Sequence, residues 1–369
     1  MEVRWIESSD EFKEIASKWD EAVRRCDSDE PFLLSDFVLS WWKHFSQGRS
    51  LRILVVFDGE KVVGGLPLYS EKVNGIESLR YVGAADFDVA NYTNILRGSS
   101  SSELIEAILV SLVQRKDWDI LTLDRLRASS ENYHTITQAV EASPLLTLRQ
   151  AEMPSFQIQV PASLEDHLKQ VKKNLRYNVR RAYKSAEQMG GLDLRKISGS
   201  QSVERLFDTY VELSVDSYSS RSLSSTFENE RLCAFFKDLF VRLDRAGSLD
   251  AYALYLAGEL LAIGFGYSVK CNLNYILTTF NKKYTELNPG HLLMAELLKV
   301  AVSRNSPVMD LFTGKQLHKT QWTSDSELVR YLEIGRPTIV NRMKAAKYFA
   351  STRLDASEFG RGVKRIIGS

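Results

Sequence analysis

The chain has 369 residues, 44% hydrophobic and 26% charged, a balance that excludes disorder and a length that suits two domains of about 150–200 residues. Its net charge of +1 excludes attraction of the whole molecule to nucleic acid or anionic membrane, so such binding would need a local patch. The three cysteines, Cys26, Cys233 and Cys271, form no CxxC pair and are expected to be reduced thiols. With no signal-peptide pattern and no apolar window near 18 residues, we expect a cytoplasmic protein.

Periodicity predicts the elements of the first 160 residues in chain order. After a short alternating strand, Ser8 and Glu11 form a capping box ahead of an amphipathic helix over 9–25. The runs LRILVVF and KVVGGLPLY are strands that meet at Asp58-Gly59, a strong hairpin signal. The other expected elements are a helix that begins at a Ser35 cap, strands at 79–83 and 92–96, a helix at 102–115, a strand at 119–126, a helix at 131–142, and strands at 145–149 and 155–160.

The same order of elements returns near residue 250. The segment LDAYALYLAGELLAIGFGYSV is again strand, turn and strand, and aligning Gly59 with Gly258 also aligns Gly65 with Gly264. A strand at 273–280, a helix at 290–304 and a strand at 308–312 follow, as in the first half. We therefore predict a duplication: an α/β (α+β) protein of two tandem mixed sheets flanked by helices.

A basic segment, SLEDHLKQVKKNLRYNVRRAYKSAEQMGG, separates the two halves. It predicts one long helix from a Ser163 cap to a Gly190-Gly191 stop. Four of its basic residues repeat at helical spacing and form a ridge beside the apolar stripe: Lys169, Lys173, Arg176 and Arg180. An anionic ligand or plain solvent could face this ridge. The expected domains are 1–161, the connecting helix 162–191, and 192–369.

The order of hairpin, third strand, helix and parallel strand resembles the N-acetyltransferase-like (GNAT) fold. The tandem arrangement is similar to the CelD/BioF-type acetyltransferase-like family, relatives of the Fem aminoacyltransferases. The segments that carry the resemblance are PFLLSDFVLSWWKHF, KKNLRYNVRRAYKSAE, YTELNPGHLLMAELLKVA and VMDLFTGKQLHKTQW. The resemblance covers nearly the whole chain. It implies transfer of an acyl group from acyl-CoA, or in the Fem branch an aminoacyl group from charged tRNA, to an amine or hydroxyl.

An acyl-CoA donor would need a site for its pyrophosphate, which a helix N-terminus can supply through free N–H groups and its dipole. The candidate is Asn288-Pro289-Gly290-His291, which opens the helix predicted in the second half. A complete GNAT loop carries more glycines, and an ordinary turn before a helix explains the same residues. The resemblance also implies that strand 273–280 lies beside the donor, splayed from strand 308–312. Thr278, Thr279 and Phe280 complete the expected donor site.

Transfer to an amine needs a neutral nitrogen and hence a base, for which Asp310 and His318 are the candidates. Lys319 occupies the position of the lysine in the Lys-x-x-aromatic closing of Fem-like families, where it would bind phosphate or neutralise developing charge. Each has a structural alternative: a strand residue bonded to a loop, a surface histidine and a solvated lysine. Because no GxSxG or cysteine–histidine signature appears, we expect direct attack without a covalent enzyme intermediate.

The acceptor is expected to be a small molecule or a glycan. Tyr218 and Arg221 lie in a polar segment suited to a sugar or carboxylate, although a plain helix connection explains it equally well. Arg176 and Arg180 could hold the 3′-phosphate of CoA, an anionic glycan or tRNA. No metal-ligand spacing appears, so no metal is predicted. The hypotheses are an acyl-CoA-dependent transferase, with envelope or exopolysaccharide assembly implied by the resemblance, a tRNA-dependent Fem-like transferase, and a non-catalytic scaffold.

Overall fold

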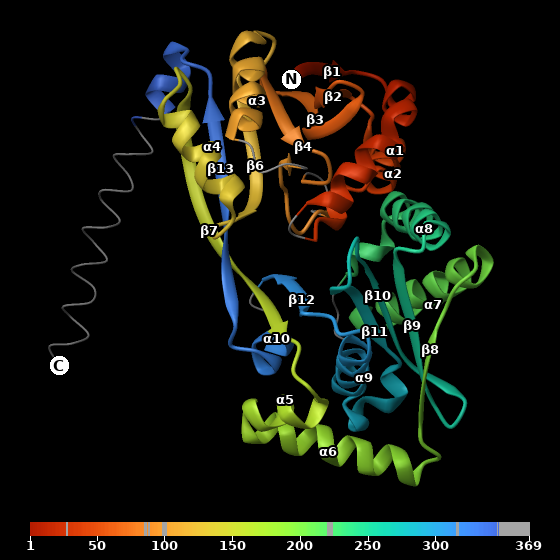
Figure 1. The fold of residues 1–369 in the computed structure, drawn as a ribbon. Coiled ribbons are helices and arrows are strands. Elements are labelled where there is room, and N and C mark those ends of the chain that lie inside the picture. Colours follow the sequence, from red (N-terminus) through yellow and green to blue (C-terminus); the bar gives the residue numbers. More distant parts are fainter. Residues whose placement is uncertain are drawn as a thin grey trace, which may run out of the picture.

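The computed structural model describes residues 1–26, 29–84, 87, 89–97, 102–219, 224–314, 317–344 and 346 (Figure 1). The first half contains β1 (Glu2–Ile6), α1 (Ser9–Arg25), α2 (Ser35–Phe45), β2 (Arg49–Asp58), β3 (Lys61–Val73), β4 (Ile76–Tyr81), β5 (Leu96–Arg97), α3 (Ser102–Gln114), β6 (Ile120–Arg127), α4 (Glu131–Glu141) and β7 (Leu146–Gln159). The second half contains α5 (Leu164–Gln170), α6 (Lys173–Gln188), β8 (Leu192–Lys196), α7 (Ser200–Ser219), α8 (Glu230–Arg245), β9 (Leu249–Leu256), β10 (Glu259–Tyr267), β11 (Leu273–Phe280), α9 (Pro289–Ser303), β12 (Val308–Thr313), α10 (Leu317–Trp322) and β13 (Ser326–Gly335). Short 3-10 helices occupy Pro31–Leu33, Thr226–Glu228 and Lys282–Leu287.

The two halves repeat one topology. In the first, β1-β2-β3-β4 are antiparallel neighbours and β4 pairs in parallel with β6 after α3. In the second, β8-β9-β10-β11 are antiparallel neighbours and β11 pairs in parallel with β12 after α9. Helices α1 and α2 precede the first hairpin as α7 and α8 precede the second. The predicted α/β fold with tandem mixed sheets is therefore confirmed.

The two sheets are joined because the halves exchange strands. The last strand of the first half, β7, pairs with β12, and the last strand of the second half, β13, pairs with β6. β7 and β13 also pair with each other along their length, so the described strands form one continuous sheet that runs through both halves (Figure 1).

The structure corrects two of the strand predictions. The strands expected at 145–149 and 155–160 are one strand, β7, because its first part pairs with β13 and its last part with β12. The polar residues between the two parts hide this continuity in the sequence. The strand expected at 92–96 is reduced to β5, which pairs with β3 only at Gly64 and Gly65.

Of the two serines predicted to cap α1 and α2, the structure confirms Ser8 and corrects Ser35. Ser8 caps α1 by accepting a hydrogen bond from the Glu11 N–H at 3.1 Å, as expected. Ser35 is not the cap of α2 but its first helical residue. Its N–H and hydroxyl donate to the two Asp20 carboxylate oxygens, at 2.8 and 2.7 Å, so a distant side chain satisfies this helix end.

The predicted single basic helix is wrong: α5 ends and α6 begins on either side of an extended Val171 (φ −77°, ψ 164°). The break lets Leu168 of α5 and Val179 of α6 pack in the same core, which also contains buried residues of α9. Tertiary packing thus divides a segment that holds no proline or glycine.

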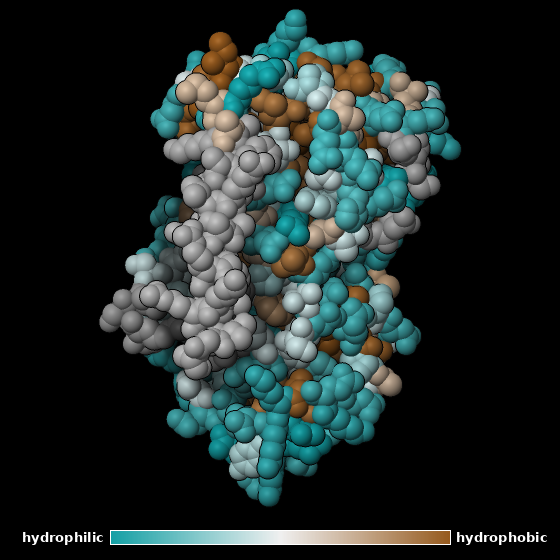
Figure 2. All heavy atoms as spheres, turned by 90° about the vertical axis from the view of Figure 1, so that its left-hand side faces the viewer, coloured by the Kyte–Doolittle hydropathy of each residue, from teal (hydrophilic) through white to brown (hydrophobic). Residues whose placement is uncertain are grey.

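In Figure 2 the lower end of the molecule, where Figure 1 places α5 and α6, is largely hydrophilic. Among the described helices, none is long and apolar enough to cross a bilayer.

Candidate functional site

The predicted donor residues lie together in one pocket at the start of α9, which we call the α9 pocket. It has a volume of about 420 Å³, within the range of small-molecule sites. α7, the 3-10 helix Thr226–Glu228, β11, the N-terminus of α9 and the end of α10 form its walls. Seven of the residues expected to bind donor or acceptor line it: Tyr218, Thr278, Thr279, Phe280, Asn288, Gly290 and His291.

One wall of the α9 pocket is a strand that separates from its parallel neighbour. β11 pairs with β12 only at Leu273 and Asn274, opposite Met309 and Asp310. On its other edge β11 stays paired with β10 up to Phe280. The edge of β11 from Tyr275 to Phe280 therefore carries backbone groups without a β12 partner. Four residues of this segment line the pocket: Tyr275, Thr278, Thr279 and Phe280. The predicted splay is present.

The N-terminus of α9 leaves one backbone donor at the pocket. Asn288 has a left-handed conformation (φ 51°, ψ 56°), and its carbonyl accepts from the N–H groups of His291 and Leu292 at 2.9 and 3.2 Å. Pro289 has no N–H, so within the described residues the Gly290 N–H is the unbonded donor of the first turn. A Cβ on Gly290 would meet open space, with no atom within 4 Å. This helix end can receive an anion.

Trp322 lines the α9 pocket and is hydrogen-bonded to another lining residue, His291. The Trp322 indole N–H donates to His291 Nδ1 at 3.1 Å, which assigns the His291 proton to Nε2. Burial lowers the pKa of His291, so the ring is neutral near pH 7. His167 of α5 also contacts Trp322. The two rings stack with centroids 5.8 Å apart, and His167 Nε2 lies 2.9 Å from the Trp322 carbonyl oxygen. Sequence reasoning missed His167, which meets Trp322 only through the fold.

Lys319 lies one helical turn before Trp322 in α10. Its ammonium donates to the Thr313 carbonyl at 2.6 Å, at the end of β12. Burial lowers the pKa of Lys319 to about 8, and the negative charge of Asp310 opposes this shift. His318 is its neighbour in α10, and the His318 side chain lies outside the described residues.

Asp310 faces away from the α9 pocket. It is buried, and both carboxylate oxygens lie 2.8 Å from the Tyr92 hydroxyl of the first half. Arg127 Nη2 donates to its Oδ2 at 2.9 Å and the Phe312 N–H donates to Oδ1 at 2.8 Å. The structure thus places Asp310 in a network of donors, and Lys319 does not line the α9 pocket, although Trp322 one turn later does. Tyr92 and Arg127 gave no signal in the sequence because they meet Asp310 from distant segments.

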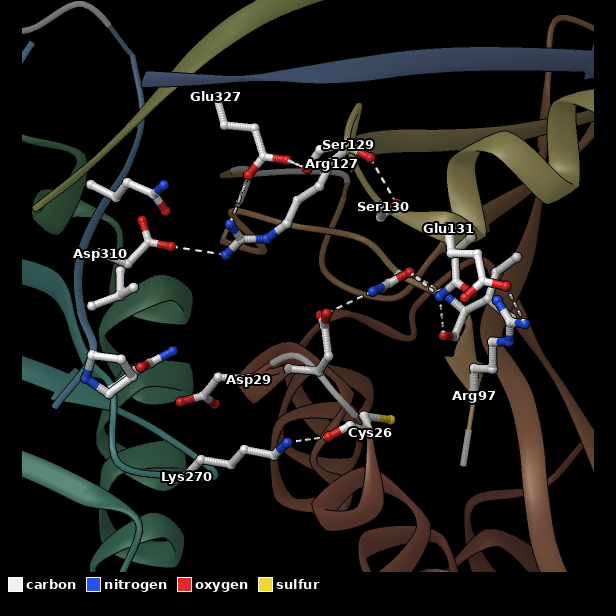
Figure 3. A pocket seen from close by; sticks show the side chains of 18 of the residues that line it. Cys26, Asp29, Arg97, Arg127, Ser129, Ser130, Glu131, Lys270, Asp310 and Glu327 are labelled. Atoms are coloured by element: carbon white, nitrogen blue, oxygen red, sulfur yellow. Dashed lines mark hydrogen bonds and ion pairs between the residues drawn. The ribbon is translucent and has the colours of Figure 1, made fainter. Parts of the chain in front are cut away.

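Asp310 lines a second cavity, the inter-half pocket, with a volume of about 450 Å³ (Figure 3). The first half contributes Cys26, Asp29, Glu30, Gln157 and residues of 94–97 and 127–132, and the second half contributes residues of 270–272 and 307–310 together with Glu327. Among the predicted site residues that the structure describes, Asp310 alone lines it.

The predicted basic contacts lie elsewhere. On α6, Arg180 forms an ion pair with Glu165 at 2.6 Å, and Lys169 of α5 pairs with Asp166 at 2.8 Å. Arg176 is half-buried, and neither arginine lines the α9 pocket. Arg221 lies outside the described residues. The described residues contain no group of three or more side chains that could hold a metal ion.

Residues 173–320 match the family model described as acetyltransferase (GNAT) domain. The matched segment runs from α6 into α10 and contains every lining residue of the α9 pocket except Trp322. No curated protein matches the chain.

Solved structures match over most of the chain. The structure of FemX has a TM-score of 0.61 at 12% identity and covers 90% of this chain and 97% of its own. L-PGS from Bacillus licheniformis gives 0.54 at 11% identity, covering 92% and 95%. The C-terminal domain (DUF2156) of a putative lysylphosphatidylglycerol synthetase from Agrobacterium fabrum gives 0.52 at 10% identity, covering 94% and 97%. Fold and domain match together support a GNAT-like protein, a class whose chemistry is acyl transfer.

Proposed function

We propose that the chain is an N-acyltransferase that moves an acyl group, in the first instance acetyl, from acyl-CoA to an amine or hydroxyl of a sugar or small metabolite. One observation supports this most strongly: the residues expected to bind the donor line a single pocket, together with the acceptor candidate Tyr218. The proposed relation to the CelD/BioF-type family adds envelope or exopolysaccharide assembly as the context.

The α9 pocket has groups suited to the parts of an acyl-CoA molecule. The Gly290 N–H and the positive end of the α9 dipole would hold the pyrophosphate. The unpaired edge of β11 would accept the pantetheine amides, and His291 Nε2–H adds a neutral donor. The pocket departs from the full GNAT pattern in its single glycine, and its described lining holds no lysine or arginine. The phosphates would therefore depend on backbone donors.

Direct attack fits the side chains near the pocket. The Lys319 ammonium, close to its transition between charged and neutral forms, would neutralise negative charge that develops as the acceptor attacks. His291 is not suited to act as a base, because Trp322 occupies its only free lone pair. His318 remains our proposed base. Asp310, surrounded by three donor groups, would instead hold β12 in place beside β11.

Gly290→Val tests the donor site. Because a Cβ at this position meets open space, the valine should leave the fold intact and project into the α9 pocket. We expect acetyl-CoA to raise the thermal midpoint of the native chain, as binding to the folded state must. The shift should disappear in Gly290→Val. Ser303→Val, an exposed change at the far end of α9, is the matched control and should keep the shift. An undiminished shift in Gly290→Val would place the donor elsewhere.

A Fem-like transferase that uses aminoacyl-tRNA is the second candidate, favoured by the whole-chain fold match to FemX. It predicts tRNA binding that weakens steeply with added salt, because phosphate contacts release counterions. Arg176→Ala and Arg180→Ala would then reduce that slope. Failure of both acetyl-CoA and tRNA to stabilise the protein would instead support a non-catalytic scaffold.

A further inference from the structure

The inter-half pocket is the counterpart in the first half of the α9 pocket. The α9 pocket lies beside the segment that joins α7 to α8 and beside α10. The inter-half pocket lies beside the segment that joins α1 to α2 and beside α4, which occupy the same places in the first topology. Its lining is quite different, so the duplication has produced two cavities of unlike chemistry.

Charge distinguishes the inter-half pocket. Eight ionisable side chains other than cysteine line it, five of them carboxylates: Asp29, Glu30, Glu131, Asp310 and Glu327 against Arg97, Arg127 and Lys270. Arg97 is paired with Glu131 at 2.7 Å. Arg127 is shared between Asp310 and Glu327, at 2.9 and 3.0 Å, and Lys270 donates to the Cys26 carbonyl. The negative charge in the pocket therefore exceeds the positive charge.

Two acceptor atoms of the lining are buried without a hydrogen-bond donor among the described residues. Asp29 is only 7% exposed, and this burial raises the pKa of its carboxyl. Its Oδ1 accepts from the Val269 N–H at 2.9 Å, and the Lys270 N–H and ammonium and the Asn274 amide also stabilise the charged form, while its Oδ2 has no hydrogen bond among the described residues. Asn132 donates to Asn94 Oδ1 and to the Ile95 carbonyl, while its own Oδ1 has no partner. Buried polar atoms are normally satisfied, so two such acceptors in one cavity indicate a ligand that donates hydrogen bonds. In Figure 3 Asp29 lies between Asp310 and Lys270 on the side of the pocket facing the second half.

We propose that the inter-half pocket binds a polar ligand that carries an ammonium group, with the size and hydroxyl content of an amino sugar. The Asp29 carboxylate receives the ammonium group, and Asn132 Oδ1 receives a hydroxyl. Arg127 Nε, a buried donor that also has no partner, provides a contact for a ligand oxygen. Gln157, Asn272 and Ser129 add neutral polar groups to the wall, and the cavity is large enough for one hexose. This site is separate from the proposed donor pocket and does not depend on acyl transfer.

The test compares two sugars that differ only at the amine. Glucosamine is a cation at pH 7, and N-acetylglucosamine has the same ring with the charge removed. By isothermal titration we expect the full chain to bind glucosamine at least tenfold more tightly than N-acetylglucosamine. Asp29→Asn should reduce glucosamine affinity tenfold or more. The matched control is Asp10→Asn, an exposed carboxylate on α1, which should leave the affinity unchanged.

Stability and location separate this proposal from a structural role. Without ligand, Asp29→Asn should keep or raise the thermal midpoint, because it keeps the acceptor for Val269 and removes a buried charge. Gly290→Val should bind glucosamine like the native chain. Equal affinity for the two sugars, no binding of glucosamine, or native affinity in Asp29→Asn would overturn the proposal. Loss of binding in Gly290→Val would also overturn it, because the amine would then occupy the α9 pocket.

Discussion

The hydroxyl of Tyr92 lies 2.8 Å from both carboxylate oxygens of Asp310, although 218 residues separate the two in the chain. Tyr92 is bonded to Ser155 of β7 as well, at 2.6 Å, and the Arg127 guanidinium lies over its ring at 4.1 Å. One tyrosine of the first half thus holds an aspartate of β12, the strand that pairs with the start of β11. This contact couples the packing of the two halves to the position of β12.

Tyr92→Phe should lower the free energy of unfolding by about 1.5–3 kcal/mol, because a buried hydrogen bond to a charged group is lost. Urea denaturation followed by fluorescence measures this change. Tyr177→Phe removes a hydroxyl from an exposed tyrosine on α6 and should change stability by only a few tenths of a kcal/mol. Equal effects of the two substitutions would show that the Tyr92–Asp310 contact contributes nothing.

Arg127→Met should destabilise the protein by about 3–5 kcal/mol, because it leaves Asp310 buried without its cation. Adding Asp310→Asn should recover part of the loss, since the uncompensated charge is then gone. A double-mutant cycle on unfolding free energies measures the coupling. Additive effects of the two changes would contradict an interaction between Arg127 and Asp310.

We expect turnover to fall at alkaline pH because Lys319 loses its charge, which gives the pH profile an alkaline limb. The pKa of Lys319 is about 8, so the ammonium is present below that pH and is lost above it. If its charge stabilises the transition state, turnover at saturating acetyl-CoA should fall as pH rises through 8. Lys319→Ala should fold normally and lose more than tenfold in turnover. Lys319→Arg, which keeps its charge, should move the limb above pH 10. A native pH profile in Lys319→Ala would remove this residue from the mechanism.

The same pKa predicts a stability effect. The folded pKa lies below the ordinary value of 10.5, so the unfolded chain binds more protons between pH 8 and 10.5. Lys319 should therefore make stability rise with pH across that window. Lys319→Met should flatten this part of the stability curve, measured by urea titration at several pH values. An unchanged curve would mean that the lysine is solvated.

Gly266→Ala should cost about 2–3 kcal/mol, because the new Cβ would lie 1.8 Å from the Asn274 carbonyl oxygen and would force two backbones apart. The position lies at a β-bulge opposite β11, beside the point where β11 leaves β12. Gly264→Ala is the matched control on the same strand. The three atoms nearest to its Cβ would be side-chain atoms of Leu293 and Leu297 in α9, the closest at 3.3 Å, so we expect a cost below 1 kcal/mol. Thermal denaturation of both variants measures the two costs. Equal costs would show that the contact between Gly266 and the Asn274 carbonyl is not tight.

Local signals were sufficient for most elements of this protein. Apolar spacing predicted α1 and α3, the Asp58-Gly59 hairpin predicted β2 and β3, and the repeat of the same pattern predicted β9 to β12. The sequence also grouped the residues of β11 and α9 that line the α9 pocket, because a helix start and the preceding strand are close in the chain and so appear as one motif. Short-range order in the sequence carries this information directly.

The sequence by itself therefore determined the duplicated α/β pattern and predicted that α9 begins near Asn288, where its candidate residues line one pocket. Only the tertiary structure decided the exchange of β7 and β13, the break between α5 and α6, and the partners of Asp310. Each of these depends on contacts between segments more than a hundred residues apart, and such contacts leave no local periodicity. The inter-half pocket belongs to the same group, since residues from both halves must meet before its excess of carboxylates becomes one site.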